Sequence, residues 1–348
     1  MGPGYHIYLC SVLIDMVRDF GALWLRPEDS DEEYSDEAEY FFTGDQRRVI
    51  DAMSQWLRTL AGTFFEEPVE QDLTGTALCM PMEPQFESAA FPITPLGPRD
   101  RAWLLKTSQE GENGKDFFAW WTPGFNAEYF LGRALTQMWT NVRWRAPVND
   151  AEKKLLQEVV GSLDAAYRLD PFRPYPWAEW AEILQFLNAD GSSREVIRKN
   201  ITGEPAIGYR RKNVTVVLPG GWRMRLPGSF SEFQSDEEGN FFALSPPSEI
   251  WFTAYRFATS LERGAFESRR QEIRQGQPEH LEEDENYVAN GAIQEKIGES
   301  GDRYFLLKSS CFYPSGRAVC SIVFSKPEEQ EWALETWRSI QPPRGMAE

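Results

Sequence analysis

The stretch VTVVLPGGWRMRLPGS, residues 214–229, decides the fold of the second half of this chain. Residues 214–218 are rich in β-branched side chains, and residues 222–226 alternate apolar with basic ones; both patterns are typical of strands. Pro-Gly-Gly at 219–221 and Pro-Gly-Ser at 227–229 mark a turn after each run, because glycine readily adopts the backbone angles of tight turns. The stretch therefore predicts two successive strands separated by a short turn.

Strands and turn signals continue to the end of the chain. Further strands are predicted at residues 240–244, 250–257, 292–297, 303–313 and 317–325. A helix is expected at about 261–274, and a closing helix after Pro327. An antiparallel sheet with one inserted helix and one closing helix is an α+β arrangement. Its element order, with residues 217–222 and 324–340, resembles the PsbP-like α/β/α sandwich, whose members mostly bind proteins.

The first half of the chain predicts a mixture of helices and strands. Residues 5–17 fit either a buried strand or a short helix, and their periodicity does not decide between the two. Asp45 is expected to cap a helix. Two aromatic strands, 102–107 and 116–122, are predicted to form a hairpin around a Gly-containing turn. Further helices are predicted at 127–142, after a capping box at Asn149, and after Pro174.

Residues 188–204 are rich in Gly, Ser and charge, which is typical of a boundary between domains. The chain of 348 residues is long enough for two domains of ordinary size. We therefore expect a mixed α/β domain at 1–190, a linker at 191–207 and an α+β antiparallel-sheet domain at 208–343.

Charge is the strongest functional signal, because 54 Asp and Glu oppose 36 Lys and Arg and give a net charge of −18. Eight carboxylates lie within twelve residues, without a Lys or Arg among them: Glu28, Asp29, Asp31, Glu32, Glu33, Asp36, Glu37 and Glu39. Two further clusters follow, Asp236, Glu237 and Glu238, then residues 282–285. Such a surface repels nucleic acid and acidic lipids and attracts a cationic macromolecule. The alternative is a solvated acidic loop that only maintains solubility.

Motifs for known chemistry are missing from the sequence. There is no phosphate-binding Gly loop, no dinucleotide fingerprint, no zinc-protease motif and no nucleophile elbow. The chain has only two histidines, His6 and His280, so it offers few imidazole groups for catalysis or metal binding. The acidic run lacks the residue spacing of a calcium-binding loop. Short basic runs in acid-rich sequence do not make a nucleic-acid surface. We expect no catalytic residue, no metal, no cofactor and no direct binding of nucleic acid or membrane.

Cys311 and Cys320 flank a predicted hairpin turn. If residues 315–316 form a two-residue loop, the two sulfurs lie opposite each other and a cross-strand bond is conceivable. Two buried free thiols are the preferred interpretation, because cysteines in a reducing compartment usually pack as small apolar residues.

The compartment is expected to be the cytoplasm. Residues 1–5 carry no Lys or Arg, and the apolar run that follows is interrupted by Asp15, so the features of a signal peptide are missing. No apolar stretch approaches the roughly 20 residues that span a bilayer.

Several motifs resemble bacterial immunity proteins that accompany type VI secretion effectors with a nuclease domain. These are Trp144-Arg145-Ala146-Pro147-Val148, Tyr167-Arg168-Leu169-Asp170-Pro171, Tyr175-Pro176-Trp177-Ala178-Glu179-Trp180, Gly208-Tyr209-Arg210-Arg211 and Leu218-Pro219-Gly220-Gly221-Trp222. The resemblance implies tight stoichiometric inhibition of a cognate toxin. The charge pattern independently favours a basic partner, steered by the carboxylates of residues 28–39 and of 236–238.

Two aromatic residues are considered as anchors for such a partner. Trp177 and Trp180 fall at helical spacing, where aromatic side chains more often belong to the core than to an interface. Two other function classes stay open: a non-enzymatic scaffold or chaperone for a secretion component, and a carboxylate-based hydrolase, which would need a pocket with two facing carboxylates.

Overall fold

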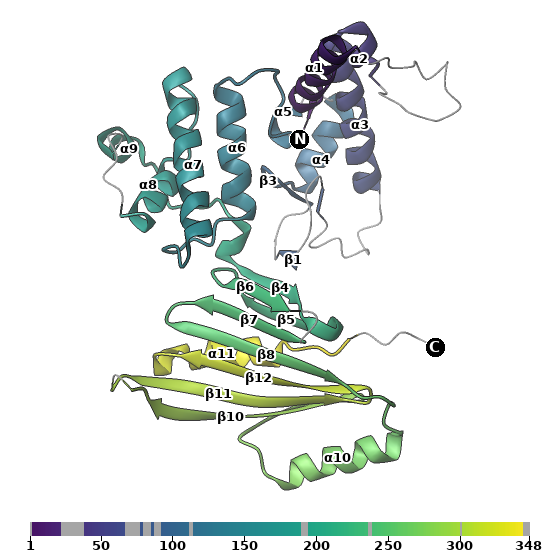
Figure 1. Ribbon diagram of the computed structural model, residues 1–348, viewed down its shortest axis with the longest axis vertical. Helices are drawn as coiled ribbons and strands as arrows, with labels where there is room; N and C mark the ends of the chain where they lie inside the picture. Colours follow the sequence, from purple (N-terminus) through teal and green to yellow (C-terminus); the bar gives the residue numbers. More distant parts are fainter. Residues whose placement is uncertain are drawn as a thin grey trace. The chain divides into compact units, whose positions relative to one another are not determined.

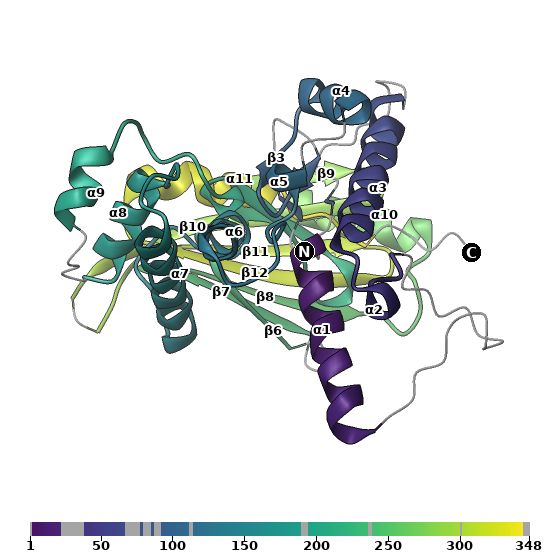
Figure 2. The same ribbon diagram turned by 90° about the horizontal axis from the view of Figure 1, so that it is seen from above.

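The computed structural model describes residues 2–21, 38–66, 77–78, 85–86, 92–110, 114–188, 194–235, 239–299 and 301–343. The chain forms two compact units (Figures 1 and 2). The first contains residues 1–82 and 87–210, and the second contains residues 83–86 and 211–348. Helices dominate the first unit, and a large antiparallel sheet with helices dominates the second. The α+β class is therefore confirmed.

The helices of the first unit, in chain order, are α1 (Pro3–Phe20), α2 (Tyr40–Thr43), α3 (Gln46–Glu66), α4 (Arg101–Glu110), α5 (Gly114–Phe117), α6 (Ala127–Thr140), α7 (Asp150–Leu169), α8 (Trp177–Phe186) and α9 (Arg194–Asn200). Two short strands, β2 (Ile93–Thr94) and β3 (Gly97–Pro98), pair with each other. Residues 5–17, left open between strand and helix, belong to α1. The cap predicted for α3 is present, because Asp45 accepts a hydrogen bond from the Arg47 N–H at 3.0 Å.

The predicted hairpin at 102–107 and 116–122 is wrong, because α4 covers the first segment and α5 begins in place of the second. Asp100 starts α4 by accepting the Trp103 N–H at its side chain, 2.8 Å away. Leu104 and Thr107, three residues apart, are then buried on one face. A capped turn with helical spacing thus outweighs the strand preference of the aromatic residues.

The core of α6, α7 and α8 includes Leu131, Met138, Leu163, Trp180 and Ile183. Asn149 caps α7 as predicted, since its side chain accepts the Glu152 N–H at 2.9 Å. The segment expected to be a linker, 191–207, contains α9. The end of this segment is held by the buried carboxylate of Glu179, which accepts hydrogen bonds from the backbone N–H groups of residues 206 and 207 at 2.7 and 3.0 Å.

The described part of the second unit contains ten strands, two helices and short 3-10 turns. The strands are β1 (Gln85–Phe86), β4 (Asn213–Val217), β5 (Arg223–Pro227), β6 (Ser231–Ser235), β7 (Asn240–Ser245), β8 (Ser248–Arg256), β9 (His280–Asp284), β10 (Tyr287–Ile297), β11 (Arg303–Tyr313) and β12 (Gly316–Phe324), and the helices are α10 (Arg263–Gln275) and α11 (Gln330–Arg338). Strands β1, β4 and β5 form a small sheet. The other seven form one antiparallel sheet in the order β6-β7-β8-β12-β11-β10-β9.

Both edge strands of the large sheet, β6 and β9, were missed in the sequence. The stretch around His280, for which the sequence predicts no strand, forms β9. An edge strand tolerates charged side chains, because only one of its sides pairs with a neighbour. The carboxylates of β9 therefore gave no strand signal.

Helices α10 and α11 pack on opposite faces of the large sheet. We call the face under α10 the outer face: Phe266 of α10 contacts Val288 and Phe312 there. On the other, inner face, Gly291 lies within 3.5 Å of Trp337 in α11, measured from an ideal Cβ position. The core of this unit lies on the inner face, with Trp222 packed against Phe252.

Candidate functional site

Three aromatic side chains form a row across the outer face. Phe233 of β6 pairs in register with Phe242 of β7, which pairs with Trp251 of β8. The ring centroids are 5.9 Å apart between the two phenylalanines and 4.2 Å apart between Phe242 and Trp251. Trp251 is 52% exposed and Phe233 is 45% exposed. We call these three residues the aromatic row.

More apolar side chains extend this surface along the strands. Tyr255 and Val319 are also exposed, and both belong to the outer face by register. Arg317 stacks over Tyr255, with its guanidinium carbon 4.9 Å from the ring centroid. Trp and Tyr side chains with Arg are the residue types enriched at protein–protein interfaces, and an exposed group of them marks an interaction site.

The charges of this surface differ in sign from the net charge of the chain. Lys308 and Arg317 are exposed on the outer face, and neither has an ion-pair partner among the described residues. Glu249 is on the same face, and it accepts a hydrogen bond from Trp251 Nε1 at 3.1 Å. The aromatic row is therefore flanked by two cations that no carboxylate of the described chain neutralises.

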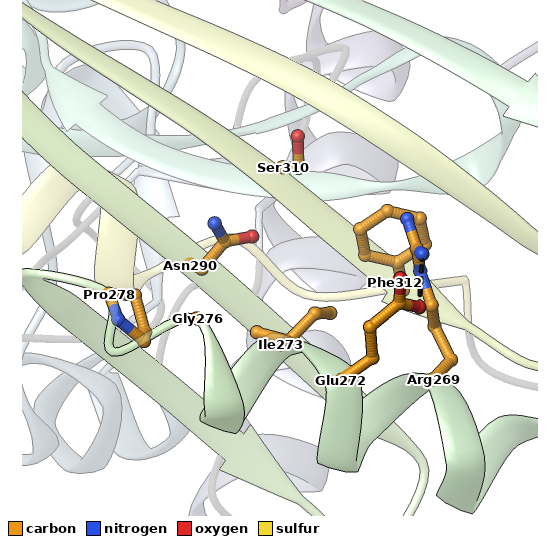
Figure 3. Close-up of a pocket in the computed structure, with 8 residues that line it drawn as sticks. All are labelled: Arg269, Glu272, Ile273, Gly276, Pro278, Asn290, Ser310 and Phe312. Atoms are coloured by element: carbon orange, nitrogen blue, oxygen red, sulfur yellow. Dashed lines mark hydrogen bonds and ion pairs between the residues drawn. The ribbon is translucent and has the colours of Figure 1, made fainter.

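A pocket of about 320 Å³ lies between α10 and the outer face (Figure 3). Arg269 of α10 pairs with Glu272 at 2.6 Å and stacks over Phe312 at 4.8 Å. Asn290 and Ser310, paired across β10 and β11, also line the pocket. Their side chains have no hydrogen-bond partner among the described residues. The pocket can therefore accept a polar group, and its single lining carboxylate is already paired with Arg269.

The inner face holds two cysteines. Cys311 pairs in register with Ala318 and Cys320 with Ser309, because the hairpin loop consists of residues 314–315. The opposed arrangement considered from the sequence is therefore wrong, and both thiols are free and buried. Burial raises the pKa of the Cys311 thiol to about 12 and raises that of Cys320 as well. Neither thiol is exposed for nucleophilic chemistry.

The acidic residues predicted as a partner surface are only partly described. Glu39 is exposed and its carboxylate pairs with Arg48. The remaining predicted carboxylates lie outside the described residues: Glu28, Asp29, Asp31, Glu32, Glu33, Asp36, Glu37, Asp236, Glu237 and Glu238. In the third cluster, Glu283 pairs with Arg274 at 2.6 Å, and this hydrogen bond lowers the pKa of the Glu283 carboxyl.

The two tryptophans considered as anchors pack inward. Trp180 is fully buried, so it offers no surface to a partner, and its candidacy as an anchor is corrected. Trp177 is half-buried and stacks on Trp180, with centroids 5.6 Å apart. The structure instead exposes Trp251, which lies beside half-buried Phe242. Their signal in the sequence was the phase of the strand pattern: both fall on the face opposite to buried Phe252 and Phe241.

Within the described part of the chain, no group of three or more His, Cys, Asp and Glu side chains is placed to hold a metal ion. Among the same residues, every helix is too short or too polar to cross a bilayer. No family model and no curated protein matches the sequence. A crystal structure from Bacteroides thetaiotaomicron VPI-5482 is similar at a TM-score of 0.31 and 19% identity, over 40% of this chain and 50% of that one. This chain thus spans half of that structure's length.

Proposed function

We propose that this chain is an immunity protein: in the cytoplasm of the producing cell it binds a cognate secreted toxin, a basic nuclease effector, and inhibits it by stoichiometric protein–protein contact. The single observation that supports this most is the aromatic row with Arg317 on the uncovered part of the outer face. Large exposed aromatic side chains beside an arginine are typical anchors of tight interfaces. The net charge of −18 supports a basic partner, because opposite net charges accelerate association.

The chemistry of the proposal is binding without turnover. The field of the acidic chain increases the rate of encounter, and the aromatic side chains slow dissociation once they are desolvated. An inhibitor of this kind needs no cofactor and no metal. A standard interface would bury on the order of 1,600 Å² in total.

The test is affinity purification of the tagged chain from its native cytoplasm, with mass spectrometry and a salt titration of the retained proteins. We expect one basic partner at equal stoichiometry, which is toxic when it is expressed alone and harmless when the two proteins are expressed together. Several weakly retained partners would instead indicate a scaffold or chaperone. Retention of no partner, or a partner without toxicity, contradicts the proposal.

Charge reversal gives a second arm to this test. Replacing the carboxylates of residues 28–39 by lysine should slow association with the purified toxin and reduce its salt dependence, while dissociation changes little. An unchanged association rate would show that this run does not steer the partner.

A further inference from the structure

Helix α10 covers only one end of the outer face. It packs on β10 and β11 through Phe266, Val288 and Phe312, and in Figure 1 it lies beside β10. Seven strands spaced about 4.8 Å apart make a sheet roughly 29 Å wide. A helix with its side chains is only about 10–12 Å in diameter, so it covers about two strands. Strands β12, β8, β7 and β6 therefore leave room beside α10 for a second helix.

The uncovered end has the composition of a packed surface. The aromatic row and Val319 (39% exposed) are large apolar side chains turned toward solvent on adjacent strands. Where the face of a sheet is buried, helices or another sheet cover it, and in this sheet a helix already occupies the same face at β10 and β11. A strand, in contrast, would add at an edge of the sheet. The layer that fits here is therefore a helix.

The charges around the row specify the chemistry of that helix. Lys308 lies in the same cross-strand row as Trp251, separated from it by Ser321, and Arg317 lies beside Tyr255. Because neither cation has an ion-pair partner among the described residues, a carboxylate on the occupant would gain a charge-assisted hydrogen bond at each. A lysine or arginine there would meet like charge.

A second copy of this chain fits the surface poorly. Each copy carries a net charge of −18, so two copies repel each other as they approach. The occupant therefore belongs to a partner protein that is not strongly acidic overall, although it is acidic locally.

We propose that the outer face of the sheet, next to α10, docks an amphipathic helix of a partner protein, whose apolar stripe packs on the aromatic row and whose flanking Asp and Glu side chains pair with Lys308 and Arg317. The inference rests on the proposed function only for the identity of that partner as the toxin. The place and the chemistry of the docking site follow from the sheet itself.

The experiment measures binding of a synthetic helix to the full chain. The probe is a fluorescein-labelled 18-residue helical peptide with leucines along one stripe and glutamates on both flanks. The comparison peptide has lysine in place of every glutamate. Fluorescence anisotropy at physiological salt should show at least tenfold tighter binding of the glutamate peptide, even though the net charge of the protein favours the lysine peptide.

Two sets of variants locate the site. Trp251→Ala should weaken binding of the glutamate peptide at least tenfold, whereas Phe172→Ala, at a residue that is 94% exposed in the first unit, should leave it unchanged. Lys308→Glu combined with Arg317→Glu should abolish the preference for the glutamate peptide. The matched double charge reversal in α9, Arg198→Glu with Lys199→Glu, should preserve that preference.

Tighter binding of the lysine peptide, or equal binding to the wild-type chain and both outer-face variants, overturns the inference. So does a dimer in light scattering that Trp251→Ala dissociates, because the occupant would then be a second copy. Circular dichroism verifies that each variant is folded. If Trp251→Ala does not fold, the charge variants still decide the test. Because no toxin takes part in the peptide experiment, its result is independent of the toxin purification. Either experiment can succeed while the other fails.

Discussion

Two tryptophans on opposite faces of one sheet should respond very differently to truncation. Trp222 is only 1% exposed on the inner face, where its ring lies 5.2 Å from that of Tyr313 and 5.8 Å from that of Phe252. Trp222→Ala removes a fully buried ring and leaves a cavity, which typically costs about 3–5 kcal/mol. Trp251→Ala removes a ring that is 52% exposed. Water fills the space that it leaves, so no cavity forms.

The expected cost of Trp251→Ala follows from area. A tryptophan side chain has a surface of up to about 250 Å², so truncating a half-buried one removes about 120 Å² of buried apolar surface. At about 25 cal/mol per Å² this area corresponds to roughly 2–3 kcal/mol. The methyl group that remains and the compactness of the unfolded chain both reduce this value. We therefore expect about 1–2 kcal/mol, clearly less than for Trp222→Ala.

Urea titrations, monitored by hydrogen exchange and mass spectrometry on peptides from β8 and β12, measure the loss of stability caused by each substitution within the second unit. The matched pair is its own control, because the chemical change is identical. Equal destabilisation by the two substitutions would refute the reasoning: Trp251 would then be buried in solution, and the outer face would not be open to a partner.

Two further predictions concern buried polar groups. Glu179→Ala removes the acceptor of two hydrogen bonds from the backbone N–H groups of residues 206 and 207, and it should destabilise the first unit by about 2–3 kcal/mol. Glu179→Gln retains one oxygen and should cost about 1 kcal/mol. Equal hydrogen-exchange rates of residues 203–208 in the two variants would contradict this prediction. Burial raises the pKa of Cys311 from 9.0 to about 12, so the stability from its neutral thiol is complete below pH 9 and is lost as the pH rises from 9 through 12. In urea titrations, Cys311→Ala should therefore flatten the fall in stability above pH 9, and an unchanged slope argues against the assignment.

Local signals account for the elements that the sequence predicted well. Asn149 and Asp45 cap helices through hydrogen bonds to N–H groups two or three residues away, which depend on little beyond the local chain. The turns at 219–221 and 227–229 separate β4, β5 and β6, because glycine and proline restrict the backbone locally. These interactions act over a few residues, so they can be recognised in the sequence.

The errors arise where distant packing decides. The segment 101–110 is helical because its capped turn presents Leu104 and Thr107 to the core, and among the described residues no strand pairs with it. Edge strand β9 forms because β10 is available to pair with it, although its own residues are mostly acidic. The candidate site was missed for a related reason. Helices α10 and α11 determine which side of β8 is covered. Both helices lie elsewhere in the chain, so the residues of β8 alone do not show which side is exposed.

In the proposed complex, electrostatics would act on the partner at two distances. The first 210 residues contain 33 Asp and Glu against 20 Lys and Arg, while residues 211–348 contain 21 against 16. The field of such an excess extends over about 8 Å at physiological salt before it is screened, and it discriminates by the net charge of the approaching protein.

In the proposed complex the sign reverses at contact, because Lys308 and Arg317 would discriminate by the charge of the few partner side chains that touch the aromatic row. A basic protein without a local acidic helix would reach the surface and dissociate quickly. An acidic protein with such a helix would approach slowly. Under this proposal, only a protein that meets both conditions would associate quickly and stay bound. Because the two conditions act on different parts of the partner, their selectivities combine, and a related partner that fails either one is rejected.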